Sequence, residues 1–377
     1  MHRSIANFFK YFLKLFCLSL FLILIFLFPT KNIIYSIGST TVLPLMEKLG
    51  DNYYHTSDTK IAVAGGGSTV GVNMIQKGLT NIGNASRNPS NDEHNQSVWV
   101  SKQLSTFPIA YDGILIIANL GDLGNKTLLL DISKLIKIYE GNITNWRDVA
   151  TELPNLKITL FNRESGSGTL DSFSNALKKY NNNIKINFSS SCNVINSNTQ
   201  MIDLLENTPG SIGYAQLAYL DEIIQDKLIL PDLKTDKGTI FTPSSDKGAT
   251  DQETIQKIKE DVDKKIYESV EDPNSKTHSN YYLFWHSLNL IISLNEANIK
   301  TIKNYIHFIF TKQDIVAKAQ YLPVYDGNNF YYDLNDSKFE KKSFNKCINK
   351  NDKQQECIFK LFTENPDSIR KPWWWSE

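Results

Sequence analysis

The stretch Arg163-Glu164-Ser165-Gly166-Ser167-Gly168-Thr169 joins an apolar, strand-like run, Ile158–Phe161, to a segment predicted as helix, Leu170–Tyr180. Two further loops, Gly38-Ser39-Thr40-Thr41 and Gly65-Gly66-Gly67-Ser68-Thr69, also connect strand-like runs to predicted helices. A helix N-terminus presents unpaired backbone N–H groups and the positive end of the helix dipole, so it attracts anions. Three such loops, one of them opened by an arginine, predict a binding site for a small oxyanion.

Each loop taken alone is also ordinary in α/β proteins, because serine and threonine cap helices and glycine makes tight turns. Gly66–Gly71 has the glycine spacing of a nucleotide-binding P-loop, but Val72-Asn73 stands where that loop needs Lys-Ser or Lys-Thr. Neither Ser68 nor Ser167 has a glycine two residues away on both sides, as the nucleophile elbow of serine hydrolases requires. The loops therefore indicate anion binding without a hydrolytic apparatus.

The size and charge of the chain narrow the kind of ligand. Its 377 residues are enough for two lobes with proper hydrophobic cores. Forty basic residues balance forty acidic ones, and the lysines form no stripe interleaved with aromatic residues, so the composition gives no support to nucleic-acid binding. The six histidines show no zinc-type spacing with one another or with carboxylates. We therefore expect a local anion site with no metal and no cofactor.

The first 30 residues differ from the rest of the chain. Arg3, Lys10 and Lys14 precede the apolar run Leu15–Phe28. A positive region followed by an apolar region is typical of a secretory signal, so we expect an extracytoplasmic protein. No small-x-small cleavage site follows the run, and the sequence leaves open whether residues 1–30 are a cleaved signal peptide or a retained membrane anchor.

Beyond residue 32, strand-like and helix-like segments alternate, which predicts parallel sheets covered on both faces by helices. The expected strands are Ile33–Ile37, Lys60–Ala64, Asn81–Gly83, Phe107–Asn119, Ile158–Phe161, Tyr281–Trp285 and Leu288–Ile292, and the expected helices are Leu43–Tyr53, Val70–Gly78, Ile132–Tyr139, Leu170–Tyr180 and Glu296–Thr311. The stretch from about residue 232 to residue 276 is polar and poor in aromatic residues, so we expect it at the surface. No internal repeat of sequence is evident.

The end of the chain has a different composition. After about residue 336 it becomes charged and rich in Asn and Lys, and it carries Trp373, Trp374 and Trp375 close to its end. These tryptophans fit a poorly ordered tail, a membrane-interface contact or a hydrophobic plug. Cys347 and Cys357 either form a disulfide in an oxidising compartment or remain free thiols. A disulfide between them would leave Cys192 without a partner.

Asp112 is the one charged residue in the apolar stretch Phe107–Asn119. A carboxylate among apolar residues is costly unless it is paired or has a function. The neighbouring Gly113 also permits a strand end that faces solvent. Both a structural and a functional interpretation of Asp112 therefore stay open.

Several short motifs occur in an order that is characteristic of one family. The motifs are Gly-Ser-Thr-Thr-Val-Leu-Pro at 38–44, Gly-Gly-Ser-Thr-Val-Gly at 66–71, Ile-Gly-Asn-Ala-Ser-Arg at 82–87, Asp-Gly-Ile at 112–114, Tyr-Glu-Gly-Asn-Ile-Thr-Asn-Trp at 139–146, Arg-Glu-Ser-Gly-Ser-Gly-Thr at 163–169 and Pro-Gly-Ser-Ile-Gly-Tyr at 209–214. With them the chain resembles the PstS-like phosphate-binding proteins of high-affinity phosphate ABC transporters, over roughly residues 33–330.

The resemblance implies an α/β fold of the periplasmic-binding-protein-like type II, in which two lobes joined by two crossover strands close on a ligand like a hinge. It places the crossings near Gly113–Ala118 and Tyr281–His286. The expected division is 1–30 as signal peptide or N-terminal membrane anchor, 31–115 as the first part of lobe I, 116–280 as lobe II, 281–336 as the second part of lobe I, and 337–377 as a C-terminal tail.

The resemblance also implies which residues bind phosphate when the motifs are matched position by position. The expected donors are Thr40, Thr41 and Ser68 from lobe I, and Arg163, Ser167, Gly168 and Thr169 from lobe II. In one branch of the family, an aspartate after the strand that follows the second loop accepts the proton of the phosphate. Here Ser86 and Arg87 stand at that position, and we expect Arg87 and Asp112 to share the role.

The expected ligand is inorganic phosphate, because phosphate near neutral pH carries at least one proton and sulfate carries none. A set of donors with one acceptor carboxylate favours phosphate, since sulfate would leave that carboxylate unpaired. No pair of nucleophile and base is visible, so we expect no catalysis.

The expected partners are the transmembrane subunits of an ABC permease and, through the N-terminal segment, the membrane, with the protein itself a monomer. A secreted phosphatase on the same fold is one alternative, and it would need metal ligands or an activated nucleophile. A membrane-anchored phosphate sensor or adhesion protein is the other alternative.

Overall fold

The computed structural model describes residues 32–90, 92–121, 128–223, 228–235, 240–241, 252–271 and 284–324. The predicted signal peptide or anchor, Cys347, Cys357 and the three tryptophans near the end of the chain lie outside these residues. Within the described ranges, no helix combines the length and the apolar character needed to cross a membrane.

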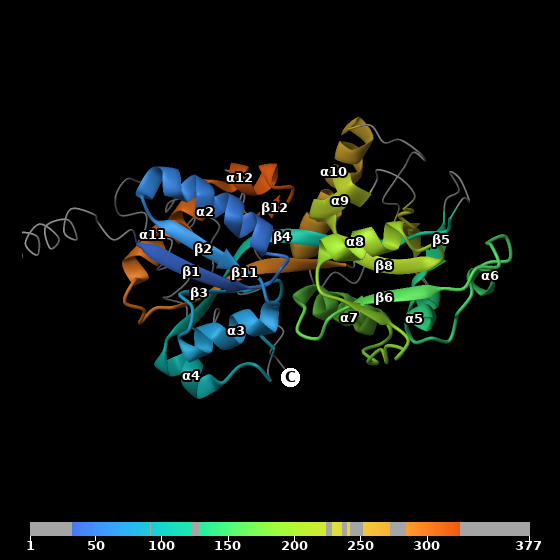
Figure 1. The fold of residues 1–377 in the computed structure, drawn as a ribbon, viewed down its shortest axis with the longest axis horizontal. Helices are drawn as coiled ribbons and strands as arrows, with labels where there is room; N and C mark the ends of the chain where they lie inside the picture. Colours follow the sequence, from blue (N-terminus) through green and yellow to red (C-terminus); the bar gives the residue numbers. More distant parts are fainter. Residues whose placement is uncertain are drawn as a thin grey trace, which may run out of the picture.

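Lobe I is built on a parallel sheet whose first strand lies in the middle. Its elements follow in the order β1 (Ile33–Gly38), α2 (Leu43–Ser57), β2 (Lys60–Ala64), α3 (Ser68–Lys77) and β3 (Ile82–Ala85). Strand β1 pairs in parallel with β2 on one side and with β3 on the other. The connection from β1 to β2 through α2 runs one way across the sheet, and the connection from β2 to β3 through α3 runs the other way. Right-handed crossovers therefore place α2 and α3 on opposite faces (Figure 1).

Lobe II repeats this arrangement. Its central elements are β6 (Thr159–Arg163), α7 (Gly168–Tyr180), β7 (Asn193–Ile195), α8 (Asn198–Glu206) and β8 (Ser211–Gln216). Strand β6 lies between β7 and β8 and is parallel to both, as β1 is to β2 and β3. The carboxyl end of the middle strand therefore opens onto a helix N-terminus in both lobes, although the sequence shows no repeat.

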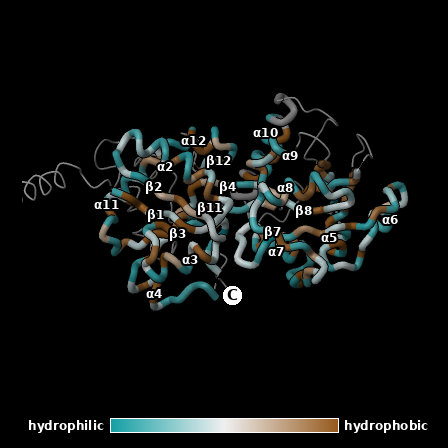
Figure 2. Tube along the Cα trace, viewed as in Figure 1, coloured by the Kyte–Doolittle hydropathy of each residue, from teal (hydrophilic) through white to brown (hydrophobic). Residues whose placement is uncertain are grey.

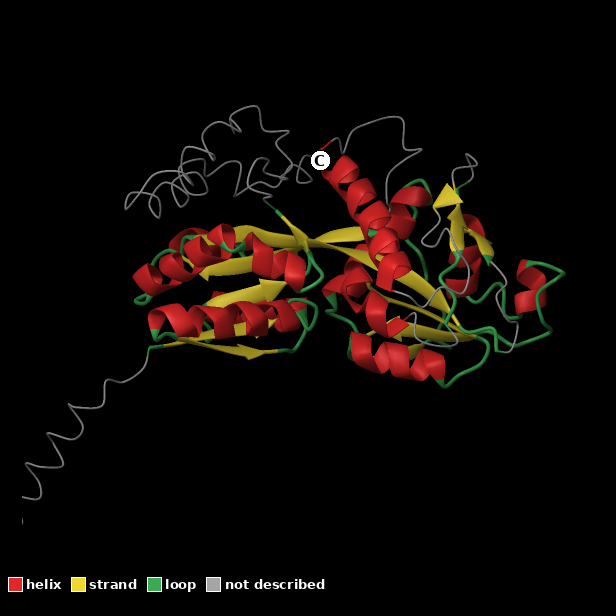
Figure 3. Cartoon of the chain, turned by 90° about the horizontal axis from the view of Figure 1, so that it is seen from above, coloured by secondary structure: helices red, strands yellow, loops and turns green. Residues whose placement is uncertain are grey.

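Two long strands join the lobes. Strand β4 (Leu104–Ala118) is antiparallel to β11 (Trp285–Ser293) up to Gly113 and then antiparallel to β8 from Ile114 onward. Figure 3, seen from above, shows these strands running from one lobe into the other. The predicted two-lobed α/β fold with two crossover strands is confirmed, while the boundaries at 115/116 and 280/281 stay predictions.

The remaining elements cover the two sheets or extend them. They are α4 (Gln96–Ser101), β5 (Leu129–Asp131), α5 (Ile132–Tyr139), α6 (Trp146–Val149), η1 (Leu217–Tyr219), α9 (Leu220–Ile223), β9 (Asp232–Lys234), β10 (Ile240–Phe241), α10 (Gln252–Glu271), α11 (Ile299–Thr311), α12 (Gln313–Lys318) and β12 (Leu322–Pro323). Strand β11 runs without a break across the gap that the sequence predicted between Trp285 and Leu288, while residues 281–283 of the other predicted strand lie outside the described residues. Helix α10 lies in the polar stretch that was expected only to cover the surface, and it buries Ile258, Val262 and Ile266.

The core runs through both lobes along the strands. Figure 2 shows the hydrophobic residues concentrated on the strands in the middle of each lobe and the hydrophilic residues toward the outside. In lobe II, Phe173 of α7 stacks on Tyr214 of β8, with ring centroids 4.2 Å apart, and contacts Tyr139 at 5.0 Å. Such aromatic pairs add to the free energy of burial, so they fix α7 and hence the position of its N-terminus.

Helix α3 lies directly on the backbone of lobe I because glycine makes the close approach possible. A Cβ atom on Gly71 would lie 2.3 Å from the carbonyl oxygen of Asn84 and 3.0 Å from the Cα atom of Gly38. A Cβ on Gly38, which has φ +149°, would lie 2.1 Å from the same oxygen. The close packing also lets the N–H of Gly67 donate to the carbonyl of Gly38 at 2.9 Å, which joins the first two loops.

We expect Gly71→Ala to lower the free energy of unfolding by about 2–4 kcal/mol, because the added methyl group meets backbone atoms that cannot move aside. Urea denaturation measures the loss. Gly65→Ala is the control, since the nearest atom to its Cβ is a side-chain methyl group of Thr40 at 3.1 Å. Equal losses in the two variants would contradict the packing described for α3.

Candidate anion-binding site

The structure brings the three glycine- and hydroxyl-rich loops together at the boundary between the lobes. Thr41 of lobe I and Thr169 of lobe II share a hydrogen bond, with 2.9 Å between their Oγ1 atoms. Nη2 of Arg163 donates to Oγ1 of Thr40 at 3.2 Å. The N–H of Thr69 donates to the carbonyl of Gly166 at 3.3 Å. Each contact joins one lobe to the other, so the loops face one another as the anion-site interpretation requires.

Two helices begin within these loops. Helix α3 begins at Ser68 and helix α7 begins at Gly168 with Ser167 as its N-cap, whose Oγ accepts from the N–H of Leu170 at 3.4 Å. A Cβ atom on Gly168 would lie 2.2 Å from Oγ of Ser86 and 2.4 Å from Oγ of Ser68. Only glycine therefore fits at this position, where the start of α7 lies against two buried hydroxyl groups of lobe I.

Ser68 and Ser86 form a buried pair in lobe I. Their Oγ atoms lie 3.3 Å apart, and the N–H of Ser86 donates to Oγ of Ser68 at 3.0 Å. Both residues are fully buried. Since a hydroxyl group both donates and accepts, this pair can turn a hydrogen atom toward an anion without adding charge.

Arg163 supplies the positive charge of the site, and its side chain has no solvent exposure. Its Nε donates to Oε2 of Glu164 at 2.9 Å and its Nη2 to Oε1 of the same carboxylate at 3.0 Å. Carbonyl groups of Ile195 and Asn196 accept from Nε and Nη2 at 3.2 and 3.3 Å. A buried charge is tolerable only when it is paired and hydrogen-bonded, and the carboxylate meets that condition.

One donor of Arg163 is left for a ligand. Nη1 carries two N–H bonds, and within the described part of the chain it has one partner, Oδ1 of Asn198 at 3.3 Å. Nδ2 of Asn198 in turn donates to Oε1 of Gln216 at 3.0 Å. The sequence did not single out Asn198 or Gln216, although Asn198 stands at the strand-to-helix turn that opens α8.

Arg87 has a different environment from the one expected for a phosphate ligand. Its Nη1 and Nη2 both donate to the carboxylate of Glu93 at 2.7 Å, and Nη2 also donates to Oγ1 of Thr69 at 3.0 Å. Nε donates to Asp171 of α7, and the carbonyl of Asn88 accepts from Nη1. The guanidinium has five N–H donors, and each has a partner among the described residues. Arg87 joins lobe I to α7 of lobe II, and its expected part in phosphate binding stays a prediction.

The two carboxylates around Arg87 differ in their environment. Burial raises the pKa of Glu93, but hydrogen bonds from Arg87 and Thr69 outweigh it and lower the pKa to about 2. Burial raises the pKa of Asp171, and the charge of Arg87 offsets this rise only in part. The Glu93 side chain is 11% exposed and that of Asp171 is 39% exposed. The ion pair of Arg87 with Glu93, within lobe I, is thus stronger than its ion pair with Asp171, between the lobes.

Asp112 lies on the crossover strand β4, directly opposite His286 of β11. It is fully buried, and neither carboxylate oxygen accepts a hydrogen bond of normal geometry from the described residues. Nε2 of His286 lies 4.0 Å from Oδ2 of Asp112, and Nδ1 of His286 lies 2.7 Å from the carbonyl oxygen of Ser86. Because a carbonyl only accepts, Nδ1 carries the proton, and Nε2 of the neutral ring faces Asp112 with its lone pair. His286 therefore connects Asp112 to the loop that holds Ser86.

Burial shifts the pKa of both members of this pair. It raises the pKa of Asp112 well above its usual value, against the opposing effects of Lys259 and of the N–H groups of Gly113 and Ala218. It lowers the pKa of His286 to about 4. Both shifts favour neutral groups, so this pair is not a permanent ion pair at neutral pH.

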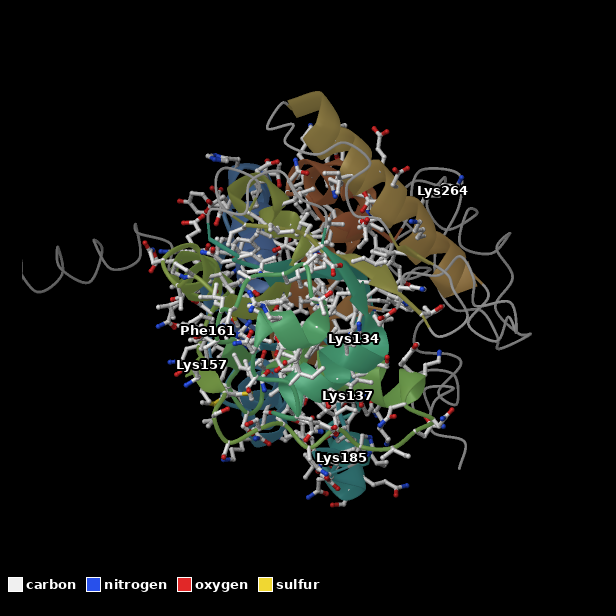
Figure 4. The ribbon with its side chains drawn as sticks, turned by 90° about the vertical axis from the view of Figure 1, so that its right-hand side faces the viewer. Lys134, Lys137, Lys157, Phe161, Lys185 and Lys264 are labelled. Atoms are coloured by element: carbon white, nitrogen blue, oxygen red, sulfur yellow. The ribbon has the colours of Figure 1, made fainter. Side chains whose placement is uncertain are left out.

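Other charges lie elsewhere in lobe II. Figure 4 looks at the end of lobe II and labels Lys134, Lys137, Lys157 and Lys185 there. Lys157 precedes β6 and Lys185 follows α7, so both lie at the opposite end of these elements from the loop at 163–169. Arg163 is the one basic residue within the three loops themselves. Among the described residues, no group of three or more His, Cys, Asp or Glu side chains could hold a metal ion.

Comparison with known sequences gives a consistent set of relatives. The family model of the PBP superfamily domain matches residues 29–313. The phosphate-binding protein PstS of Borreliella burgdorferi is 29% identical over 215 residues, which cover 56% of this chain and 72% of the relative. The uncharacterized lipoprotein MG412 of Mycoplasma genitalium is 28% identical over 336 residues, which cover 76% of this chain and 80% of the relative. Other relatives named phosphate-binding protein PstS match over 61–63% of their own length, slightly less than two thirds.

Comparison with solved structures supports the fold. A putative phosphate ABC transporter substrate-binding protein from Clostridium perfringens, solved with bound phosphate, superposes with a TM-score of 0.55. It is 22% identical, and the match covers 78% of this chain and all of that chain. At this identity the likeness concerns the arrangement of helices and strands.

We expect Glu93→Gln to lower the free energy of unfolding by about 3 kcal/mol at pH 7, because Arg87 loses its strongest partner. The lowered pKa of Glu93 increases the free energy of unfolding. This contribution is complete above pH 4.5, the ordinary pKa of the group, and is lost as the pH falls to about 2. Urea denaturation of wild type and variant between pH 7 and pH 2.5 measures the gap, which should narrow to a small remainder over this range. A gap independent of pH would contradict the assignment, and Glu260→Gln, at an exposed position of α10, serves as control.

Proposed function

Because the chain belongs to the PBP superfamily, we propose that it is an extracytoplasmic solute-binding protein that captures inorganic phosphate between its lobes and delivers it to an ABC permease. The observation that carries the proposal is the meeting of three loops around one buried arginine, Arg163, whose Nη1 retains a free N–H. The name of the Borreliella burgdorferi relative supports phosphate as the ligand.

The proposed phosphate ligands come from both lobes. Hydroxyl and backbone N–H groups of the loops would surround the anion, and Arg163 would supply a charge-assisted hydrogen bond. These ligands are Thr40, Thr41, Ser68 and Ser86 from lobe I, and Arg163, Ser167, Gly168 and Thr169 from lobe II. Several of these groups bond to one another across the lobe boundary, so binding would exchange those hydrogen bonds for bonds to the anion. Arg87 is assigned to the contact between the lobes.

Asp112 is the proposed acceptor for the proton of phosphate. When ionised, its carboxylate can only accept hydrogen bonds, so it favours a ligand that carries a proton. The raised pKa of Asp112 adds a condition, because a protonated carboxyl group can donate to sulfate. We therefore expect discrimination against sulfate to increase as the pH rises through the pKa of Asp112.

The proposal includes the cellular role. The apolar N-terminal segment and the similarity to a lipoprotein of Mycoplasma genitalium support a place outside the cytoplasm, held at the membrane. The transmembrane subunits of the permease would be its partners, and the protein would act as a monomer. We propose no catalytic activity. The carboxylate of Glu93 accepts a hydrogen bond from the hydroxyl group of Thr69, but it is also bound by Arg87 and its pKa is lowered to about 2, so it is a poor general base. A sensor on the same fold would bind phosphate equally well and would differ only in its partner.

We expect Arg163→Ala to weaken phosphate binding by on the order of 2–5 kcal/mol, because a desolvated anion loses its charged partner. Titration calorimetry measures the loss. Arg147→Ala, at an exposed position of α6, is the matched control and should bind phosphate like the wild type. A loss smaller than about threefold in Arg163→Ala would remove Arg163 from the site.

We expect Asp112→Asn to weaken phosphate binding modestly and to improve sulfate binding, because the amide replaces part of an acceptor by a donor at nearly constant volume. Competition between the two anions, measured for wild type and variant at several pH values, gives the selectivity. An unchanged ratio of phosphate to sulfate affinity at every pH would reduce Asp112 to a structural residue of the hinge.

A further inference from the structure

The two lobes repeat one polar contact as well as one arrangement of strands. In lobe I, Ser68 begins α3 and bonds to Ser86, the residue after β3. In lobe II, Asn198 begins α8 and bonds to Gln216, the last residue of β8. Both pairs are separated by 18 residues in sequence. The place that a hydroxyl pair takes in lobe I is therefore taken by an amide pair in lobe II.

The amide pair acts on Arg163. Oδ1 of Asn198 accepts from Nη1 of Arg163 at 3.3 Å, while Nδ2 of Asn198 donates to Oε1 of Gln216 at 3.0 Å. If the Asn198 amide were turned over, its NH2 group would face a guanidinium that has no acceptor. The guanidinium excludes this orientation, and Oε1 of Gln216 holds the amide of Asn198 in place by accepting its NH2 group on the side away from Arg163. The position of Asn198 thus depends on both residues.

Burying Gln216 costs free energy, so a contribution to stability does not explain why it stands there. It is fully buried at the hinge, opposite Ile114 of β4, and Asn198 is 2% exposed. Nε2 of Gln216 has no hydrogen-bond partner within the described residues. A buried donor without a partner is unfavourable, and an apolar side chain of similar size would avoid it. The remaining role of the side chain is the hydrogen bond to Asn198.

We propose that Gln216 is a positioning residue for the bound anion. By fixing the amide of Asn198, it holds Nη1 of Arg163 in the orientation that leaves one N–H for phosphate. Gln216 acts through Arg163 and does not itself touch the ligand. The inference rests on the proposed function, because the readout is the affinity for phosphate.

One substitution separates positioning from packing. Gln216→Met keeps the size of the side chain and removes the acceptor, so we expect phosphate affinity to fall by about tenfold or more. A packing role predicts no such loss, because methionine fills a buried site as well as glutamine does and leaves no donor without a partner. Gln256→Met, at an exposed position of α10, controls for the substitution itself.

A double-mutant cycle with Arg163→Ala tests whether Gln216 acts through the arginine. In the Arg163→Ala background, Gln216→Met should change phosphate affinity by less than about twofold, measured by calorimetry at high phosphate concentration. The inference is overturned if Gln216→Met binds within threefold of the wild type, or if the two losses simply add. Gln216→Asn, whose shorter amide cannot reach Asn198, replaces the methionine variant if that protein does not fold. A wild type that binds no phosphate would overturn the proposed function instead.

Discussion

The candidate site depends on one buried guanidinium charge and on the groups that form hydrogen bonds with it. The side chain of Arg163 has no solvent exposure. The cost of burying its charge is offset by hydrogen bonds to the Glu164 carboxylate, two carbonyl groups and one amide oxygen. Removing a charge from water costs several kcal/mol unless such partners surround it. The partners come from β6, from the end of β7 and from the start of α8, and Thr40 adds one from the other lobe. The packing of lobe II around β6 is therefore also what creates the positive centre of the site.

The closed arrangement of the lobes follows from contacts that converge on the same loops. Thr41 meets Thr169, Thr69 meets Gly166, and Arg87 reaches from lobe I to Asp171 on α7. The crossover strands β4 and β11 are the continuous covalent links between the lobes, and they carry Asp112 and His286 side by side. A change in the site can thus reach the hinge through Ser86 and His286, which a hydrogen bond of 2.7 Å connects. The contacts between the lobes and the hinge are therefore neighbours in the structure.

The sequence predicted the parts of the fold and the site that local chemistry determines. Glycine, serine and threonine at strand ends marked the three loops, since close approach and N–H groups at helix starts need those residues. Helix α10 was missed because its polar composition hid a narrow stripe with four-residue spacing, Ile258, Val262 and Ile266.

The partners of the two arginines could not be predicted in the same way. Asp171 lies 84 residues from Arg87, and Asn198 lies 35 residues from Arg163. No local pattern encodes such pairings, because they arise only when the strands are assembled into a sheet. Arg87 is an example. Its position in a motif suggested an anion ligand, whereas the packing of α7 against lobe I surrounds it with carboxylates.

Titration of the wild-type protein with phosphate and with sulfate at pH 8 tests whether the site selects phosphate. We expect saturable phosphate binding with a dissociation constant of about 1 μM or tighter, and sulfate binding weaker by roughly a hundredfold or more. The buried positive centre at Arg163 would supply the affinity, and Asp112 would supply the discrimination. Absence of saturable phosphate binding up to about 1 mM, or equal affinity for the two anions, would contradict this expectation.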